Sequence, residues 1–295
     1  MNATERLAKL ALGTAQFGLA YGVANQRGQL PVEEAHAILQ HAEKAGLRTL
    51  DTAIAYGSSE AVLGGTNLGG FEVITKLSAV PDGCSDVEAW VATELEGSLA
   101  RLNIARIDGL LLHRPAQLLE ASGAALYNAL SKQREQGLVR RIGISIYAPE
   151  ELDQLLERYQ LDLVQAPFNI MDTRLRDSGW LERLARSGTR LHVRSVFMQG
   201  LLLMSKQARP AKFDRWSAHW SLWQDWLKQT GLTPLQACLR HALAVPEIER
   251  VVVGVDSLAQ LVGILHAAQG EFPEPPAALA CGDVELLNPS LWNSL

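Results

Sequence analysis

The chain has 295 residues, of which 47% are hydrophobic and 20% are charged, and its formal net charge is -5. This is the composition of an ordinary globular protein, long enough for one large α/β barrel or two modest domains. The mild acidity argues against a nucleic-acid partner, because nucleic-acid-binding surfaces normally carry a basic stripe.

Cysteine usage and the N-terminus indicate where the protein works. Cys84, Cys238 and Cys281 are odd in number and far apart in the sequence. They predict neither a metal site nor a disulfide framework, and they favour a reducing cytoplasm. The first ten residues, MNATERLAKL, contain no apolar segment typical of a signal peptide, and no stretch is predicted to span a membrane.

Short apolar runs recur along the whole chain, separated by segments of helical periodicity. Because most of these runs are continuous rather than alternating, they indicate strands of a parallel sheet that is covered on its outer face. The runs predicted to be strands are residues 9–13, 47–51, 71–76, 107–113, 140–145, 161–166, 189–195 and 250–254.

The intervening segments contain helix-start signals. Three capping boxes are predicted, Ser85 with Glu88, Thr233 with Gln236, and Ser257 with Gln260. Eight strand–helix units in fewer than 300 residues favour an α/β fold of the (β/α)8 TIM barrel type, and no G-x-G-x-x-G follows the first strand. We expect a single barrel domain over residues 1–295, with an insertion at about 201–232 and an irregular tail from about 269.

Four chemically active side chains fall at the carboxyl ends of predicted strands. Asp51 ends the second strand and Tyr56 follows it in LDTAIAYG, Lys76 ends the third strand, and His113 ends the fourth. Barrel enzymes carry their chemistry at this end of the barrel. Singly, each residue is more often structural than catalytic, but their shared placement predicts one site.

These residue types suit proton donation to an oxygen that gains negative charge. A phenol has an ordinary pKa near 10, so it is a poor acid at neutral pH, and a neighbouring ammonium lowers that value by stabilising the phenolate. A carboxylate beside the lysine keeps it charged, and a histidine can orient a substrate carbonyl. Carbonyl reduction is the obvious reaction of this kind.

At this point the chain resembles the aldo-keto reductases over nearly its whole length. The similarity is carried by LALGTAQFG, LDTAIAYGSSEAVLG, VITKL, LLLHRP, LVQAPFN and VVVGVDSLAQL. The resemblance implies an NAD(P)H-dependent oxidoreductase without a metal, in which Tyr56 is the general acid, Lys76 tunes it, Asp51 pairs with Lys76 and His113 orients the carbonyl.

The resemblance also implies a set of cofactor-binding residues. They are Gly13, Thr14, Asp51, Ser145, Gln165, Arg194, Ser195, Gly200, Gly254, Asp256, Ser257 and Gln260. At the seventh strand the family's stacking tyrosine is absent, and either Arg194 or Phe197 is expected to fill that space. At Asp256, where many members carry a basic residue for the 2′-phosphate, a carboxylate would instead suit a free 2′-hydroxyl. On family habit NADP(H) is nevertheless expected over NAD(H).

The substrate is expected to be a small carbonyl compound, polar or sugar-type, that is reduced or formed by the reverse oxidation. Its pocket is predicted to include Phe17, Tyr21, Tyr56 and His113, with Arg194 nearby favouring an anionic or polyhydroxylated molecule. The aromatic residues spaced along 213–226 predict a helix face packed on the core. The alternative, which is more specific about function, is that one or two of these tryptophans line the substrate pocket. Two other functions stay open, a non-catalytic NAD(P)H-binding regulatory subunit and a barrel lyase or isomerase with Lys76 as nucleophile.

Overall fold

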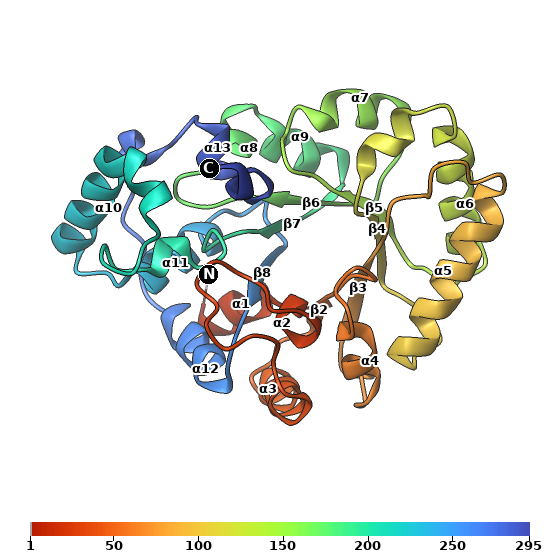
Figure 1. The fold of residues 1–295 in the computed structure, drawn as a ribbon, viewed down its shortest axis with the longest axis horizontal. Helices are drawn as coiled ribbons and strands as arrows, with labels where there is room; N and C mark the ends of the chain where they lie inside the picture. The colour runs from red at the N-terminus through yellow and green to blue at the C-terminus, as the bar shows by residue number, and fades with distance from the viewer. Residues whose placement is uncertain (1) are drawn as a thin grey trace.

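A computed structural model describes residues 2–295 as a closed barrel of eight parallel strands. Each strand pairs with its neighbours in chain order, and β8 returns to pair with β1. The (β/α)8 fold expected from the sequence is therefore confirmed (Figure 1). The strands are β1 (Leu10–Gly13), β2 (Thr49–Asp51), β3 (Glu72–Leu77), β4 (Gly109–Leu112), β5 (Ile142–Ser145), β6 (Leu163–Pro167), β7 (Arg190–Arg194) and β8 (Arg250–Gly254).

Helices surround the barrel and connect successive strands (Figure 1). The α-helices are α1 (Ala3–Ala8), α2 (Ala15–Gly18), α3 (Val32–Lys44), α4 (Ser59–Gly64), α5 (Val87–Leu102), α6 (Gly123–Glu135), α7 (Glu151–Arg158), α8 (Arg174–Asp177), α9 (Trp180–Ser187), α10 (Ser217–Thr230), α11 (Pro234–Leu243), α12 (Leu258–Ala267) and α13 (Val284–Leu287). Short 3-10 helices are η1 (Pro115–Leu119), η2 (Leu201–Leu203), η3 (Ala211–Trp216), η4 (Ala277–Leu279) and η5 (Pro289–Ser294). None of the helices in residues 2–295 is long and apolar enough to cross a membrane.

Two of the predicted capping boxes differ from expectation. The N-cap of α5 is Asp86, not Ser85, and its side chain accepts a hydrogen bond from the Ala89 N–H. At α12 the Ser257 hydroxyl caps Gln260 as expected, but the Gln260 side chain accepts from the N–H of Asp256. The box at α11 is complete, with Thr233 and Gln236 bonded reciprocally.

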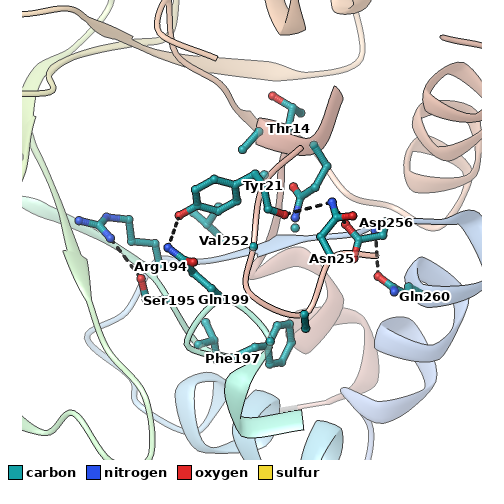
Figure 2. A pocket seen from close by; sticks show the side chains of 18 of the residues that line it. Thr14, Tyr21, Asn25, Arg194, Ser195, Phe197, Gln199, Val252, Asp256 and Gln260 are labelled. Carbon is teal, nitrogen blue, oxygen red and sulfur yellow. Dashed lines mark hydrogen bonds between the residues drawn. The ribbon is translucent and has the colours of Figure 1, made fainter. Parts of the chain in front are cut away.

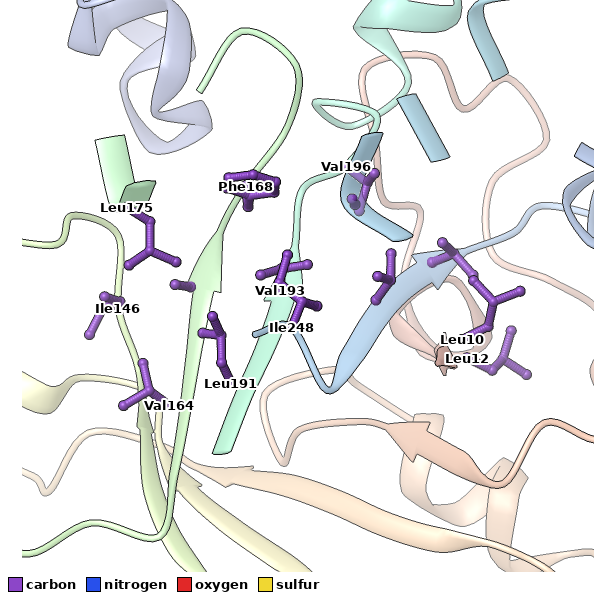
Figure 3. Close-up of a cluster of buried hydrophobic side chains, with 14 of the residues drawn as sticks. Leu10, Leu12, Ile146, Val164, Phe168, Leu175, Leu191, Val193, Val196 and Ile248 are labelled. Carbon is purple, nitrogen blue, oxygen red and sulfur yellow. The ribbon is translucent and has the colours of Figure 1, made fainter. Parts of the chain in front are cut away.

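The main core lies between the barrel and its outer helices. Figure 3 shows part of it, with side chains from β1, β6 and β7 together with residues from the segments between strands, among them Ile146, Phe168 and Val196. A separate buried cluster of Ile74, Leu111 and Leu163 comes from β3, β4 and β6 and fills the barrel interior. Since side chains alternate along a strand, residues two positions after these three also face inward, closer to the carboxyl end.

The insertion after β7 contains η2, η3 and α10. Its aromatic residues Phe213, Trp216, Trp220, Trp223 and Trp226 are at most 6% exposed. They pack on each other and on the tail, where the Trp292 ring meets Phe213 edge to face at 4.9 Å. None of these rings lines the large cavity described below, so the packing interpretation holds and the pocket-lining alternative is wrong.

Candidate active site

Three of the four predicted catalytic residues face the barrel interior because of their positions along the strands. Lys76 follows Ile74 by two positions, and His113 follows Leu111 by two, so both point into the barrel above its inner core. Asp51 is the last residue of β2, which lies beside β3. The carboxyl ends of β2, β3 and β4 thus bring the three side chains together.

Lys76 and Asp51 form a buried ion pair. The ammonium donates to Asp51 Oδ1 at 2.6 Å and to the Thr52 carbonyl at 2.8 Å, with only 1% of the lysine side chain exposed. Burial alone would lower the pKa of Lys76, but the charge and hydrogen bond of Asp51 more than offset it, so the pKa is raised. The lysine is therefore held as a cation beneath the cavity floor.

The second oxygen of Asp51 is also engaged. Gln165 Nε2 donates to Asp51 Oδ2 at 2.6 Å, and the Ser145 hydroxyl donates to Gln165 Oε1 at 3.2 Å. Gln165 is fully buried and does not line the cavity, so it lies behind Asp51 and not at the pocket wall expected for a cofactor contact. Its amide fixes the orientation of the carboxylate that holds Lys76.

Tyr56 lies in the turn after β2 and faces the cavity. Its N–H donates to the Ala53 carbonyl at 3.0 Å, and its own carbonyl accepts from the Ser59 N–H at 3.0 Å. Gly18 of α2 presses against this turn so closely that a Cβ there would fall 1.8 Å from the Tyr56 carbonyl oxygen. Because of this close approach, α2 fixes the position of the tyrosine.

The Tyr56 ring lies near both the Lys76 ammonium and the His113 imidazole. Lys76 Nζ lies 5.1 Å from the ring centroid, and the His113 ring meets it edge to face at 6.0 Å. Burial, together with the positive charges of Lys76 and Arg194, lowers the pKa of His113 to about 4. His113 is therefore neutral at pH 7 and can donate one hydrogen bond without adding charge.

A cavity of about 780 Å³ opens beside these residues. Its size is that of a small-molecule or cofactor site. The predicted site residues that line it are Gly13, Thr14, Tyr21, Asp51, Tyr56, His113, Ser145, Arg194, Ser195, Gly200, Gly254, Asp256 and Gln260. Lys76 and Gln165 lie below its surface, and Ser257 is outside the lining.

Phe17 is also misplaced by the sequence prediction. It is fully buried in α2 and does not reach the cavity, because the helix directs the ring into the core. Gln16, its neighbour, lines the cavity instead, and a Cβ on Gly254 would fall 2.8 Å from its amide. A larger residue at 254 would require the Gln16 amide to move.

The loop after β7 has an unusual backbone. Ser195, Met198 and Gln199 have φ values of 62°, 47° and 53°, a region that residues other than glycine seldom adopt, and Gly200 follows at 88°. Ser195, Gln199 and Gly200 all line the cavity. Such strain tends to gather at functional sites, where the surrounding structure enforces it.

Residues 21–28, here called the strap, cross the cavity from the β1 side (Figure 2). Gln199 Nε2 donates to the Tyr21 hydroxyl at 3.2 Å, and Asn25 Nδ2 donates to Asp256 Oδ1 at 3.3 Å. Arg27 donates to the Asp256 carbonyl at 2.8 Å. The strap is therefore tied to both the β7 and the β8 loops.

Sequence reasoning missed Gln16, Asn25, Tyr147 and Gln199 as lining residues. The length of the first loop pointed to function, but nothing in it marked Asn25, which stabilises a turn by accepting from the N–H groups of Arg27 and Gly28. Gln199 could not be found from sequence, because its role depends on a left-handed backbone conformation that is not typical of glutamine.

Comparison with known proteins identifies the family. The model of the aldo/keto reductase family matches residues 9–276. The chain belongs to this family. A D-threo-aldose 1-dehydrogenase from a Pseudomonas species is 29% identical over 92% of this chain and 95% of that protein. An aldo-keto reductase from Mycolicibacterium vanbaalenii is 33% identical over 44% of this chain and 46% of its own length.

Solved structures share the fold of this aldo/keto reductase. An aldo-keto reductase from Bacillus halodurans superposes with a TM-score of 0.71 at 19% identity, covering 90% of this chain and 88% of that one. The glycerol dehydrogenase of Gluconobacter oxydans gives 0.67 at 22% identity, with coverage of 90% and 88%. Family members act as oxidoreductases on carbonyl compounds and use nicotinamide cofactors, which fits the resemblance seen in the sequence.

Proposed function

We propose that the protein transfers hydride between a nicotinamide cofactor and a small polar or sugar-type aldehyde or ketone, in either direction, with Tyr56 as the general acid. The observation that carries this proposal is the Tyr56 ring at the cavity wall, 5.1 Å from the Lys76 ammonium and edge to face with a neutral His113. An acid, a fixed cation and a neutral donor at one wall are what carbonyl reduction needs.

Each residue has a separate part in the reaction. The bound nicotinamide supplies or accepts the hydride. His113 donates a hydrogen bond that orients the carbonyl oxygen, and Tyr56 gives that oxygen a proton. The Lys76 ammonium stabilises the negative charge left on the tyrosine oxygen, while Asp51 keeps Lys76 in place. In the oxidative direction Tyr56 accepts the proton from the alcohol.

The cavity lining fits a dinucleotide. Gly13, Gly200 and Gly254 leave the backbone open to close approach, and Thr14, Ser195 and Gln260 supply polar groups around them. The N-terminus of α12, from which Ala259 and Gln260 line the cavity, suits a phosphate. We assign the cofactor to this surface.

The Asp256 carboxylate supports NAD(H) over the NADP(H) expected from family habit. Asp256 lines the cavity, and burial raises its pKa, partly countered by the Gln260 hydrogen bond and by Arg27. The nearby Arg27 guanidinium is itself paired with Glu34 at 3.0 Å. A 2′-phosphate at this place would meet a carboxylate, whereas a 2′-hydroxyl would meet an acceptor.

The sugar-type substrate is supported by the aldose dehydrogenase among the relatives. The lyase alternative has little support, because a Schiff-base lysine must lose its proton and Lys76 is held as a cation by Asp51. A regulatory subunit would need no general acid, yet Tyr56 lies beside both Lys76 and His113. We therefore favour the enzyme.

Two measurements test the proposal. Calorimetric titration with NADH and NADPH should give saturable binding, tighter for NADH. A panel of aldoses, ketoses and aromatic aldehydes, followed by nicotinamide absorbance, should then show turnover that Tyr56→Phe lowers by about 10²- to 10⁴-fold while cofactor affinity is retained. Binding without turnover on any carbonyl would favour the regulatory subunit, and turnover unchanged in Tyr56→Phe would exclude Tyr56 as the acid.

A further inference from the structure

Arg194 at the end of β7 is a half-buried cation without a charged partner. Its Nη1 donates to the Ser195 hydroxyl at 3.1 Å and its Nη2 donates to the Ile146 carbonyl at 2.9 Å. One face of the guanidinium lies over the Tyr147 ring, 4.6 Å from its centroid. Within residues 2–295 no carboxylate comes within ion-pair distance of it. Since arginine has five N–H donors, several remain for a ligand.

The charges around Arg194 do not balance at this end of the cavity. Lys76 is neutralised by Asp51 at 2.6 Å, and His113 is uncharged at pH 7. Asp256, the other carboxylate in the lining, lies on the far side of the strap in Figure 2, beyond Tyr21 and Asn25. The catalytic end therefore carries one net positive charge, which would attract an anionic group on a ligand.

Arg194 is also near the reacting groups. It stands two residues after the inward-facing His192 on β7, so its side chain leaves the barrel wall at the mouth. Its positive charge acts on both His113 and Tyr21, which line the same cavity. The contacts with Ser195, Ile146 and Tyr147 hold the guanidinium in one orientation, which reduces the entropy lost on binding.

We propose that Arg194 binds an anionic group on the substrate, so that the preferred substrates are aldehydes or ketones carrying a carboxylate or a phosphate. The planar fork of a guanidinium matches either group with two parallel hydrogen bonds. Tyr21 and Tyr147, which are 40% and 38% exposed at the mouth, present aromatic faces beside it that suit a sugar ring. This inference rests on the proposed function and specifies its substrate class.

The test compares matched substrates that differ only in the group at C6, which is neutral in one and anionic in two. An aldose, the uronate with the same ring, and the aldose 6-phosphate are reduced by the wild type, by Arg194→Gln and by Arg194→Lys. We expect the wild type to have a higher kcat/KM for an anionic member than for the aldose. Arg194→Gln should lower that ratio by about tenfold to a hundredfold, the effect of losing charge-assisted hydrogen bonds. Arg194→Lys should keep part of the preference, because it keeps the charge and loses the fork. Whether the uronate or the phosphate is preferred identifies the anion.

Arg190→Gln is the matched control. Arg190 lies on the same strand, but its guanidinium pairs with Glu249 at 2.7 Å at the opposite end of β7, outside the cavity lining. This substitution should leave the ratio of anionic to neutral kcat/KM as in the wild type. A similar loss of ratio in Arg190→Gln would mean that the discrimination is a long-range effect of net charge, and it would overturn the proposal.

Calorimetry separates the anion site from the catalytic assignment. Titration of the uronate and the aldose 6-phosphate into the protein saturated with cofactor should show binding that Arg194→Gln weakens. If Arg194→Gln loses cofactor affinity, and if its kcat/KM falls equally for charged and neutral substrates, Arg194 binds the cofactor diphosphate and the inference is refuted. Arg194-dependent binding without turnover of any carbonyl would refute the proposed function and leave the anion site standing.

Discussion

The two ends of the cavity are built in different ways. At the catalytic end, Asp51, Lys76 and Gln165 come from barrel strands β2, β3 and β6, are at most 4% exposed and satisfy each other's polar groups. At the strap end, Asn25 and Asp256 come from loops, are half-exposed and are joined by one hydrogen bond of 3.3 Å. The first end is fixed by the register of the barrel, and the second by loop conformation.

This difference sets how freely the residues at each end can be changed. Strand register places catalytic side chains with little freedom, so a change there would break the ion pair or the core. Loop residues such as Asp256 can be replaced at smaller cost. We expect the catalytic end to determine whether the protein turns over, and the loop residues to determine which cofactor and which substrate it uses.

The largest effect is expected from Tyr56→Phe, which removes one hydroxyl and little packing. Loss of a positioned acid lowers turnover by about 10²- to 10⁴-fold. Cofactor affinity, measured by calorimetry, should stay within about twofold because the ring remains in place. If turnover falls no more than for a substitution at the strap, the functional contrast between the two ends is wrong.

Lys76→Met tests whether the catalytic end is held by its buried charges. Leaving Asp51 without a partner should lower the free energy of unfolding by about 3 to 5 kcal/mol, as read from urea denaturation. The double variant Asp51→Asn with Lys76→Met should recover part of that loss, since no lone charge remains. A double variant that is as unstable as the single one would show that the ion pair is not the source of the effect.

Asp256→Arg tests the strap end. The substitution replaces repulsion of the 2′-phosphate by a carboxylate with attraction by a guanidinium, each on the order of 1 kcal/mol in a half-exposed site. The ratio of NADPH affinity to NADH affinity should therefore rise by roughly tenfold to a hundredfold. Asp225→Arg, on the exposed part of α10, is the matched control and should leave the ratio unchanged. An unchanged ratio in Asp256→Arg would mean that Asp256 does not face the ribose.

The pKa of His113 reports the positive charge at the catalytic end. Its folded pKa of about 4 lies below the ordinary value of 6.5, so the unfolded state binds a proton more readily between these values. His113 therefore lowers stability as pH falls from 6.5 toward 4, and its influence is absent above 6.5. NMR of histidine-labelled protein should show this titration, and Arg194→Gln should move it to higher pH because one repelling charge is removed. A midpoint near 6.5 in the wild type would contradict the buried, cationic surroundings.

The smallest effect is expected at the strap itself. Asn25→Ala removes a hydrogen bond to Asp256 and should speed cofactor dissociation by a few-fold, an effect of about 1 kcal/mol. Stopped-flow release of NADH measures this rate, and turnover of a saturated enzyme would change only if release limits it. An unchanged dissociation rate would show that the strap does not retain the cofactor.

The sequence predicted the barrel and its catalytic end because both depend on periodicity. Continuous apolar runs gave eight strands, and the positions of Lys76 and His113 followed from where those runs end. The loops resisted prediction. Phe17 and Gln16 are adjacent in a short helix, and this one-residue difference determines which side chain enters the core and which lines the cavity. The left-handed conformation of Gln199 is not indicated by any residue type in the sequence. Ser85 was predicted as the N-cap, but Asp86, one residue later and an equally good capping residue, takes that position.

The most direct test of the account is the transfer of deuterium. NADH deuterated at C4 of the nicotinamide is incubated with the protein and the preferred carbonyl substrate, and the product alcohol is analysed by mass spectrometry. The account predicts one deuterium on the former carbonyl carbon of each product molecule, and it predicts that Tyr56→Phe lowers the amount of product without changing this label. Product without deuterium, or borohydride trapping of the substrate on Lys76, would contradict direct hydride transfer.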